Sequence, residues 1–181
     1  MACQLWYNAK DKEVDETMKR SRFLHTILLA CALVAGCASA DDSAGQAGHQ
    51  QHLPNGDLQE LTASLAELPS FLDQADPQVK EVYQIASQHY DLLQWIPCYC
   101  GCAESAGHQH NGHCFIAEVK EDGSVLWDDH GTRCGVCLEI AYLSSELEDQ
   151  GKSPAEIRAF IDARYREGYA EPTPTPMPPQ G

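Results

Sequence analysis

The sequence predicts a mainly α-helical domain of about four helices, with a short β-hairpin and a cysteine-rich loop that carries the functional site. Three observations support this fold class. Apolar residues recur at helical spacing in several windows, two windows open with proline directly after a capping residue, and cysteines gather between the windows. The 181 residues are 43% hydrophobic and 22% charged, which is typical of one globular domain with extensions.

Two helices are expected before the cysteine-rich loop. Leucines at spacings of three and four residues indicate a helix over 57–68, with Asp57 as its cap. A second helix over 76–95 starts with Asp76 at the N-cap and Pro77 in its first turn. Its apolar stripe leads the chain directly into the cysteine motif.

A hairpin and two more helices are expected after the loop. The apolar runs 114–119 and 125–128 flank a turn rich in Asp and Gly, which predicts the hairpin. A helix over 135–150 follows it. A last helix over 153–167 opens with the capping box Ser153-Pro-Ala-Glu156, whose side chains satisfy the first free backbone N–H groups.

The N-terminal residues predict export. Basic residues after Met18 precede an apolar run that ends in Val34-Ala35-Gly36-Cys37, and this ending resembles a bacterial lipobox. Residues 1–37 are therefore interpreted as a mis-called extension plus a lipoprotein signal peptide, with Cys37 as the lipid attachment point. A signal cut near Ala40 that discards Cys37 is the alternative. We expect an extracytoplasmic protein held at the cell membrane by its lipid.

Three segments follow the predicted signal. Residues 38–56 are rich in Gly, Ala, Gln and Ser without a hydrophobic period, which indicates a flexible tether. Residues 57–170 form the predicted cysteine-rich domain. Residues 171–181 are proline-rich and must be extended polyproline, either free or lying along the domain; both remain open.

Charge limits the possible partners. The formal net charge is −15, which argues against a nucleic-acid partner because phosphates repel an acidic surface. The same charge does not oppose an incoming cation. The sequence identifies no protein partner.

The candidate metal-binding residues are concentrated in the motif Pro97-Cys98-Tyr99-Cys100-Gly101-Cys102. Cysteines at alternate positions point the same way along an extended chain, and Gly101 allows the backbone to curl around one ion. Neighbouring thiols at i, i+2 are poor disulfide partners, because a disulfide requires a particular Cα separation and dihedral angle. Further cysteines and histidines that can join them follow: Cys114, Cys134, Cys137, His108 and His130.

The pattern as a whole resembles the PCYCGC-motif family of bacterial lipoproteins. The resemblance covers about Leu68 to Pro179 and rests on PCYCGC, Gly107-His108, Cys114-Phe115, Trp127 to Gly131, CGVC, the capping-box helix and PTPTPMP. It implies an exported, lipid-anchored protein whose cysteines suggest metal binding. It implies no particular activity.

Three interpretations of the cysteines remain open. Thiolates with nearby histidines suit a soft ion, and we favour Cu(I) over zinc held by four thiolates. Three disulfides stapling an exported domain are the structural alternative. A thiol–disulfide oxidoreductase is the third, because Cys134-Gly-Val-Cys137 begins a predicted helix, whose N-terminus lowers a thiol pKa.

The preferred hypothesis is a lipid-anchored metal-binding protein for metal storage, delivery or resistance. We expect no enzyme, because the sequence has no paired catalytic carboxylates and no serine nucleophile signature. The three cysteine groups should meet at one end of the domain. The predicted ligands are Cys98, Cys100, Cys102, Cys114, Cys134, Cys137, His108 and His130.

Overall fold

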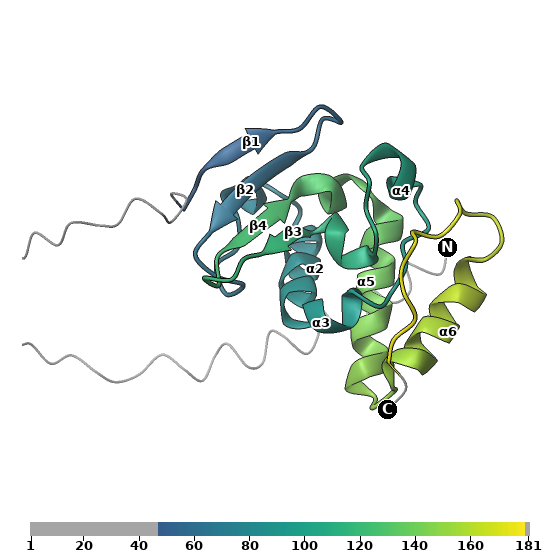
Figure 1. The fold of residues 1–181 in the computed structure, drawn as a ribbon. Coiled ribbons are helices and arrows are strands. Elements are labelled where there is room, and N and C mark those ends of the chain that lie inside the picture. Colours follow the sequence, from purple (N-terminus) through teal and green to yellow (C-terminus); the bar gives the residue numbers. More distant parts are fainter. Residues whose placement is uncertain (1–46, 180–181) are drawn as a thin grey trace, which may run out of the picture. The chain divides into compact units, whose positions relative to one another are not determined.

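The computed structural model describes residues 47–179 and has a mixed α/β fold (Figure 1). A four-stranded antiparallel sheet is covered by helices, so the prediction of a mainly α-helical domain is corrected: the sheet is larger than one hairpin. The predicted extension and signal peptide, including Cys37, lie outside the described residues. Within residues 47–179, no helix is long and apolar enough to cross a membrane.

The sheet has the strand order β1-β2-β4-β3. Its hairpin of β3 (Ile116–Val119) and β4 (Val125–Asp128) confirms the sequence prediction. Strand β2 (Leu58–Thr62) pairs with β4, and β1 (Gln50–His52) pairs with β2. Strand β1 lies inside segment 38–56, so that part of the predicted tether belongs to the sheet.

The predicted helix over 57–68 is wrong. Its first part is β2, and a short 3₁₀ helix, η1 (Ser70–Leu72), follows after a turn. The polar residues of β2 explain the difference, because each finds a partner that is distant in sequence. Glu60 accepts the backbone N–H of Ser70 at 2.7 Å, and Thr62 Oγ1 accepts the Trp127 indole N–H at 2.8 Å. These tertiary bonds override the helical spacing of the leucines.

The helix predicted over 76–95 is present but interrupted. Helix α2 (Pro77–Gln88) has the expected Asp76 cap, and α3 (Tyr90–Leu93) continues the chain after a break at His89. The two helices after the hairpin are confirmed as α5 (Gly135–Asp149) and α6 (Pro154–Tyr165), the latter with its capping box. The cysteine loop adds two short elements, α4 (Cys102–Ser105) and η2 (Asn111–Cys114), and a third, η3 (Asp129–Arg133), connects β4 to α5.

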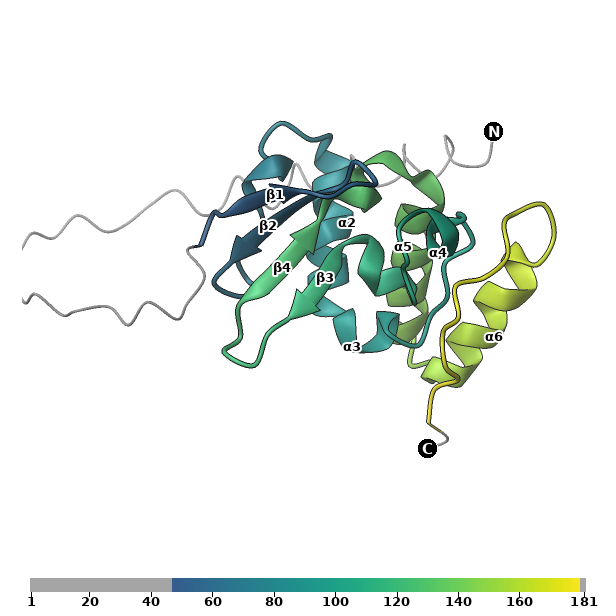
Figure 2. The ribbon, with the colours of Figure 1, turned by 45° about the horizontal axis from the view of Figure 1, so that its top comes forward.

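Helix α5 is the centre of the helical layer, between α2 and α6 (Figures 1 and 2). Helix α2 joins this layer to the sheet through Tyr83, whose hydroxyl donates to the Asp128 carbonyl at 2.7 Å. The Tyr83 ring packs edge-on against Phe115 with centroids 5.1 Å apart, and Trp127 is fully buried beside it. Burial of each such side chain contributes about 1.5–3 kcal/mol.

The proline-rich tail lies along the cysteine motif. Thr173 and Cys98 exchange two hydrogen bonds: Thr173 N–H donates to the Cys98 carbonyl at 2.9 Å, and Cys98 N–H donates to Thr173 Oγ1 at 2.9 Å. Arg158 of α6 donates to the Thr175 carbonyl at 3.3 Å, which holds the tail next to α6 (Figure 2). Of the two placements that the sequence leaves open, the structure has the tail docked.

We predict that Thr173→Ala lowers the free energy of unfolding by about 1–3 kcal/mol, because the buried Cys98 N–H loses its acceptor. Chemical denaturation of the metal-free protein under reducing conditions measures the change. Thr173→Ser is the matched control, since it keeps the hydroxyl and should retain most of the stability. Equal stability of the alanine variant and the wild type would show that the tail does not support the motif.

Candidate metal centre

Three sulfur atoms form a nearly regular triangle. Cys98, Cys100 and Cys137 have their Sγ atoms 3.4 Å apart along each edge. Two of these residues come from the PCYCGC motif and the third from the first turn of α5. The predicted meeting of the motif with the CGVC segment is therefore present in the structure.

A second group lies beside this triangle. Cys102 and Cys114 have sulfurs 3.8 Å apart, and the Cys114 sulfur is 3.5 Å from His108 Nδ1. The sulfurs of Cys98, Cys100, Cys102 and Cys114 all lie within 4.8 Å of one another. The two groups thus form one continuous cluster, in which Cys98, Cys102, Cys114 and Cys137 are at most 1% exposed.

Local backbone geometry brings these sulfurs together. Gly101 has φ +87°, a left-handed conformation that few other residues adopt, and it turns the chain from the motif into α4. Gly131 lets η3 pack closely on η2, because an added Cβ there would lie 2.7 Å from the Phe115 ring. The cluster therefore depends on glycines as well as on its sulfur atoms.

His130 is oriented by a buried carboxylate. Its Nδ1 lies 3.2 Å from Asp57 Oδ2, and Asp57 is 2% exposed and also pairs with Arg133. Contact with Cys100, together with the Asp57 charge, raises the pKa of His130 to about 9. A carboxylate that accepts a hydrogen bond from one ring nitrogen, with the other ring nitrogen turned to the site, is the usual support of a metal-binding histidine.

Asp57 is the functional residue that the sequence does not reveal. The sequence predicts Asp57 as a helix cap, whereas in the structure it precedes β2 and contacts His130 and Arg133. In the sequence Asp57 stands out only by its charge within a polar segment. That charge does not identify a partner more than seventy residues away.

The pKa values of the clustered thiols are shifted in opposite directions. Contact with Cys100 lowers the pKa of Cys98 to about 4, and contact with Cys102 lowers the pKa of Cys100. Burial raises the pKa of Cys114, and the Cys137 thiol, which donates to Cys100, also has a raised pKa. At neutral pH the cluster therefore combines thiolates with thiols that release protons when a cation replaces them.

The other predicted ligands lie at different depths. Cys134 is half-buried at the N-cap of α5, and it belongs to none of the groups whose donor atoms lie within 4.8 Å of one another. His130 belongs to two such groups, one with Cys100 and Cys137 and one with Cys102 and His108. The structure thus unites seven of the eight predicted residues, with Cys134 at the margin.

The donor set fits a thiolate-bound metal ion. An ion about 2.3 Å from two sulfurs in tetrahedral geometry separates them by about 3.8 Å, so the observed spacings of 3.4 to 3.8 Å need only small adjustments. A disulfide requires about 2.05 Å, and all six cysteines in residues 47–179 are free thiols. Sulfur with imidazole is the combination that soft and borderline metals prefer.

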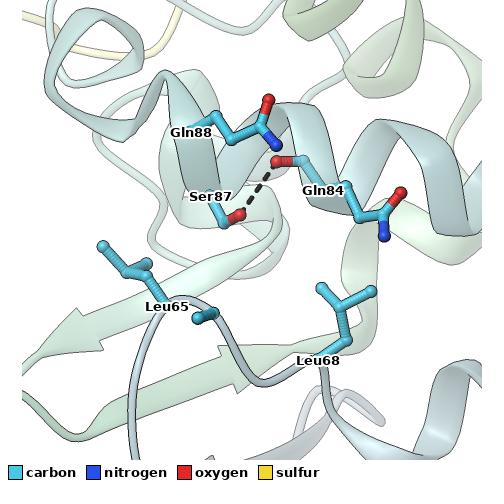
Figure 3. A pocket seen from close by; sticks show the side chains of 6 residues that line it. Leu65, Leu68, Gln84, Ser87 and Gln88 are labelled. Carbon is cyan, nitrogen blue, oxygen red and sulfur yellow. Dashed lines mark hydrogen bonds between the residues drawn. The ribbon is translucent and has the colours of Figure 1, made fainter. Parts of the chain in front are cut away.

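A surface hollow elsewhere offers no comparable chemistry. It has a volume of about 390 Å³ and lies between the turn after β2 and helix α2, where Leu65 and Leu68 face Gln84, Ser87 and Gln88 (Figure 3). The Ser87 hydroxyl donates to the Gln84 carbonyl at 2.8 Å. None of the side chains that line it is ionisable, so this hollow offers neither an acid–base group nor a metal ligand of the kind found in the cysteine cluster.

Fold and site together define a class: a mixed α/β domain whose core contains a cysteine–histidine cluster able to hold a metal ion. A family model described as "Protein of unknown function with PCYCGC motif" matches residues 26–178, and the chain belongs to this family. The resemblance found in the sequence is thereby confirmed. Comparisons with curated proteins and with solved structures found no match.

We predict that Asp57→Asn lowers the pKa of His130 from about 9 toward its ordinary value of 6.5, because the imidazolium loses an ionic partner. NMR titration of the reduced, metal-free protein measures this pKa. Protonated His130 stabilises the fold fully below about pH 6.5, and this contribution is lost as the pH rises through about 9. The stability difference between variant and wild type should therefore shrink over that range.

Asp122→Asn is the control for this prediction, since Asp122 lies on the exposed β3–β4 turn and accepts its hydrogen bonds from Ser124 of the same turn. An unchanged His130 pKa in Asp57→Asn would contradict the proposed support of the ring.

Proposed function

We propose that this chain is an exported, lipid-anchored protein that binds a soft metal ion through thiolates, Cu(I) in preference to zinc. Its use would be metal storage, delivery or resistance. The observation that carries the proposal is the triangle of Cys98, Cys100 and Cys137 sulfurs, with edges of 3.4 Å, inside a larger cysteine–histidine cluster. Thiolates favour Cu(I) and zinc among common ions.

Copper is preferred because the triangle presents three sulfurs without a fourth at equal distance. Cu(I) accepts three thiolates, whereas zinc in structural sites takes four ligands in a tetrahedron. Zinc remains the alternative ion, with His130 or Cys102 completing four ligands. The bound ion would supply positive charge that holds the thiolates together in the core.

Access to the cluster supports reversible binding. Cys100 and Cys134 are half-buried, whereas the other four cysteines are buried, so an incoming ion meets Cys100 and Cys134 first. The ion would then exchange these ligands for the deeper sulfurs while thiol protons leave. An acidic protein surface does not repel the approaching cation.

The alternatives have less support. A stapled structural protein requires pairs of cysteines at bonding distance, whereas each sulfur of the Cys98, Cys100 and Cys137 triangle has two sulfur neighbours at the same 3.4 Å. An oxidoreductase using Cys134 and Cys137 requires an accessible thiol of low pKa. Contact with Cys100 raises the pKa of both thiols, and Cys137 is fully buried.

We predict that Cys98→Ser, Cys100→Ser and Cys137→Ser each weaken Cu(I) binding at least about tenfold, because each removes one corner of the triangle. Anaerobic titration against a competing Cu(I) chelator measures the affinity, and alkylation before and after metal removal counts the thiols. Cys134→Ser is the matched control outside the triangle and should weaken binding less. Three intact disulfides, with no copper bound after reconstitution under reducing conditions, would refute a metal-binding function.

The anchor gives a separate prediction. Cys37→Ala should move the protein from the membrane fraction to the soluble fraction and abolish labelling with a fatty-acid analogue, because the lipid supplies the membrane affinity. Cell fractionation and immunoblotting measure the distribution, with Cys37 replaced in the full chain and Ala38→Ser as the neighbouring control. Unchanged partitioning of the Cys37 variant would exclude this anchor.

A further inference from the structure

We infer that the cysteine cluster is a two-ion centre, in which two copper ions share bridging thiolates. This inference rests on the proposed metal-binding function and adds the number of ions and the ligands of each. The first ion would use Cys98, Cys100 and Cys137, and the second would use Cys102, Cys114 and His108.

The first ligand set is the sulfur triangle. Its three edges are equal at 3.4 Å, and its residues come from two segments that converge from different directions, the extended PCYCGC motif and the first turn of α5. Three equidistant sulfurs complete the coordination of one Cu(I) ion. The first ion therefore needs nothing from the second group.

The second ligand set contains two sulfurs and one imidazole. The Cys102–Cys114 distance is 3.8 Å and the distance from Cys114 Sγ to His108 Nδ1 is 3.5 Å. All three side chains are buried, His108 being 7% exposed. His130 also lies within 4.8 Å of Cys102 and His108, so it stands between the two sets as a ligand available to either.

The number of donors exceeds what one ion can bind. A single Cu(I) or zinc ion takes at most four ligands, whereas five sulfurs and two imidazoles occur in overlapping groups of closely spaced donors. With one ion bound at the triangle, Cys102 and Cys114 would stay buried beside thiolates without a cation. These two sulfurs and the His108 ring would form a second donor set that a single ion leaves unused, and a second ion would occupy it.

The spacing of the two sets favours bridging over two separate sites. Sulfurs of both sets, from Cys98, Cys100, Cys102 and Cys114, lie within 4.8 Å of one another. Ions placed in each set would therefore be near enough for a shared thiolate. Cys100 is the natural bridge, because its sulfur is 3.4 Å from those of Cys98 and Cys137 and also belongs to the group that includes the Cys102 and Cys114 sulfurs of the other set.

The test is copper stoichiometry of the full chain, kept in detergent and handled anaerobically. Cu(I) is titrated against a chelator, and bound copper per protein is counted by elemental analysis. We expect two equivalents for the wild type and one each for Cys137→Ser and His108→Gln, which dismantle different sets. His89→Gln is the control, since His89 pairs with Glu148 away from the cysteines and should keep two.

Each other outcome overturns a distinct claim. One equivalent in the wild type refutes the two-ion centre and leaves the proposed function intact, whereas no copper refutes both. If both variants still bind two equivalents, the second ion lies outside the cluster and the inference is refuted. The same conclusion follows if replacing the exposed His49 and His52 removes the second equivalent. Absence of a metal–metal scattering path in X-ray absorption of the two-copper form refutes bridging.

Folding of the variants is checked by circular dichroism, because Cys137 is fully buried. If Cys137→Ser does not fold, the half-buried Cys100→Ser takes its place. Since Cys100 is the proposed bridge, this variant should bind fewer than two ions and lose the metal–metal path. Retention of two ions with that path in Cys100→Ser would also overturn the inference.

Discussion

Convergence of sulfur atoms on the first turn of α5 is the constraint on which the rest of this structure depends. Cys137 lies 3.4 Å from both Cys98 and Cys100, so the PCYCGC motif must run directly past the start of α5. Thiols that stay unpaired in a core act as small apolar groups, but thiolates there require compensating charge. The elements around α5 therefore serve to hold the motif in place and to surround its charge.

Two supports hold the motif from opposite sides. On one side the proline-rich tail pairs with the Cys98 backbone through Thr173, and Arg158 of α6 fixes the tail. On the other side η2 and η3 bring Cys114 and His130 against the cluster, with Gly131 permitting their close approach. Because the tail is C-terminal whereas η2 and η3 lie in the middle of the described chain, cluster geometry is coupled to the folding of segments that are far apart in the sequence.

The sheet contributes to the site through charge. Asp57 at the start of β2 is buried against His130 and Arg133, and Asp128 at the end of β4 accepts hydrogen bonds from the Gln59 side chain and the His130 backbone. This polar junction connects the sheet to the cysteine cluster. It explains why β2 carries buried polar residues at positions where a strand of a simple core would carry aliphatic ones.

Local sequence determined those parts of this protein whose signals lie within a few residues. The Asp76–Pro77 start, the Ser153–Glu156 capping box, the turn between β3 and β4, and the cysteine and histidine types of the cluster are all of this kind, because capping and turn bonds close locally. Tertiary structure alone decided the strand β2 in place of a helix, the docked tail and the role of Asp57. Each depends on partners far along the chain, such as Trp127 for Thr62, Cys98 for Thr173 and His130 for Asp57, and no local pattern encodes such pairings.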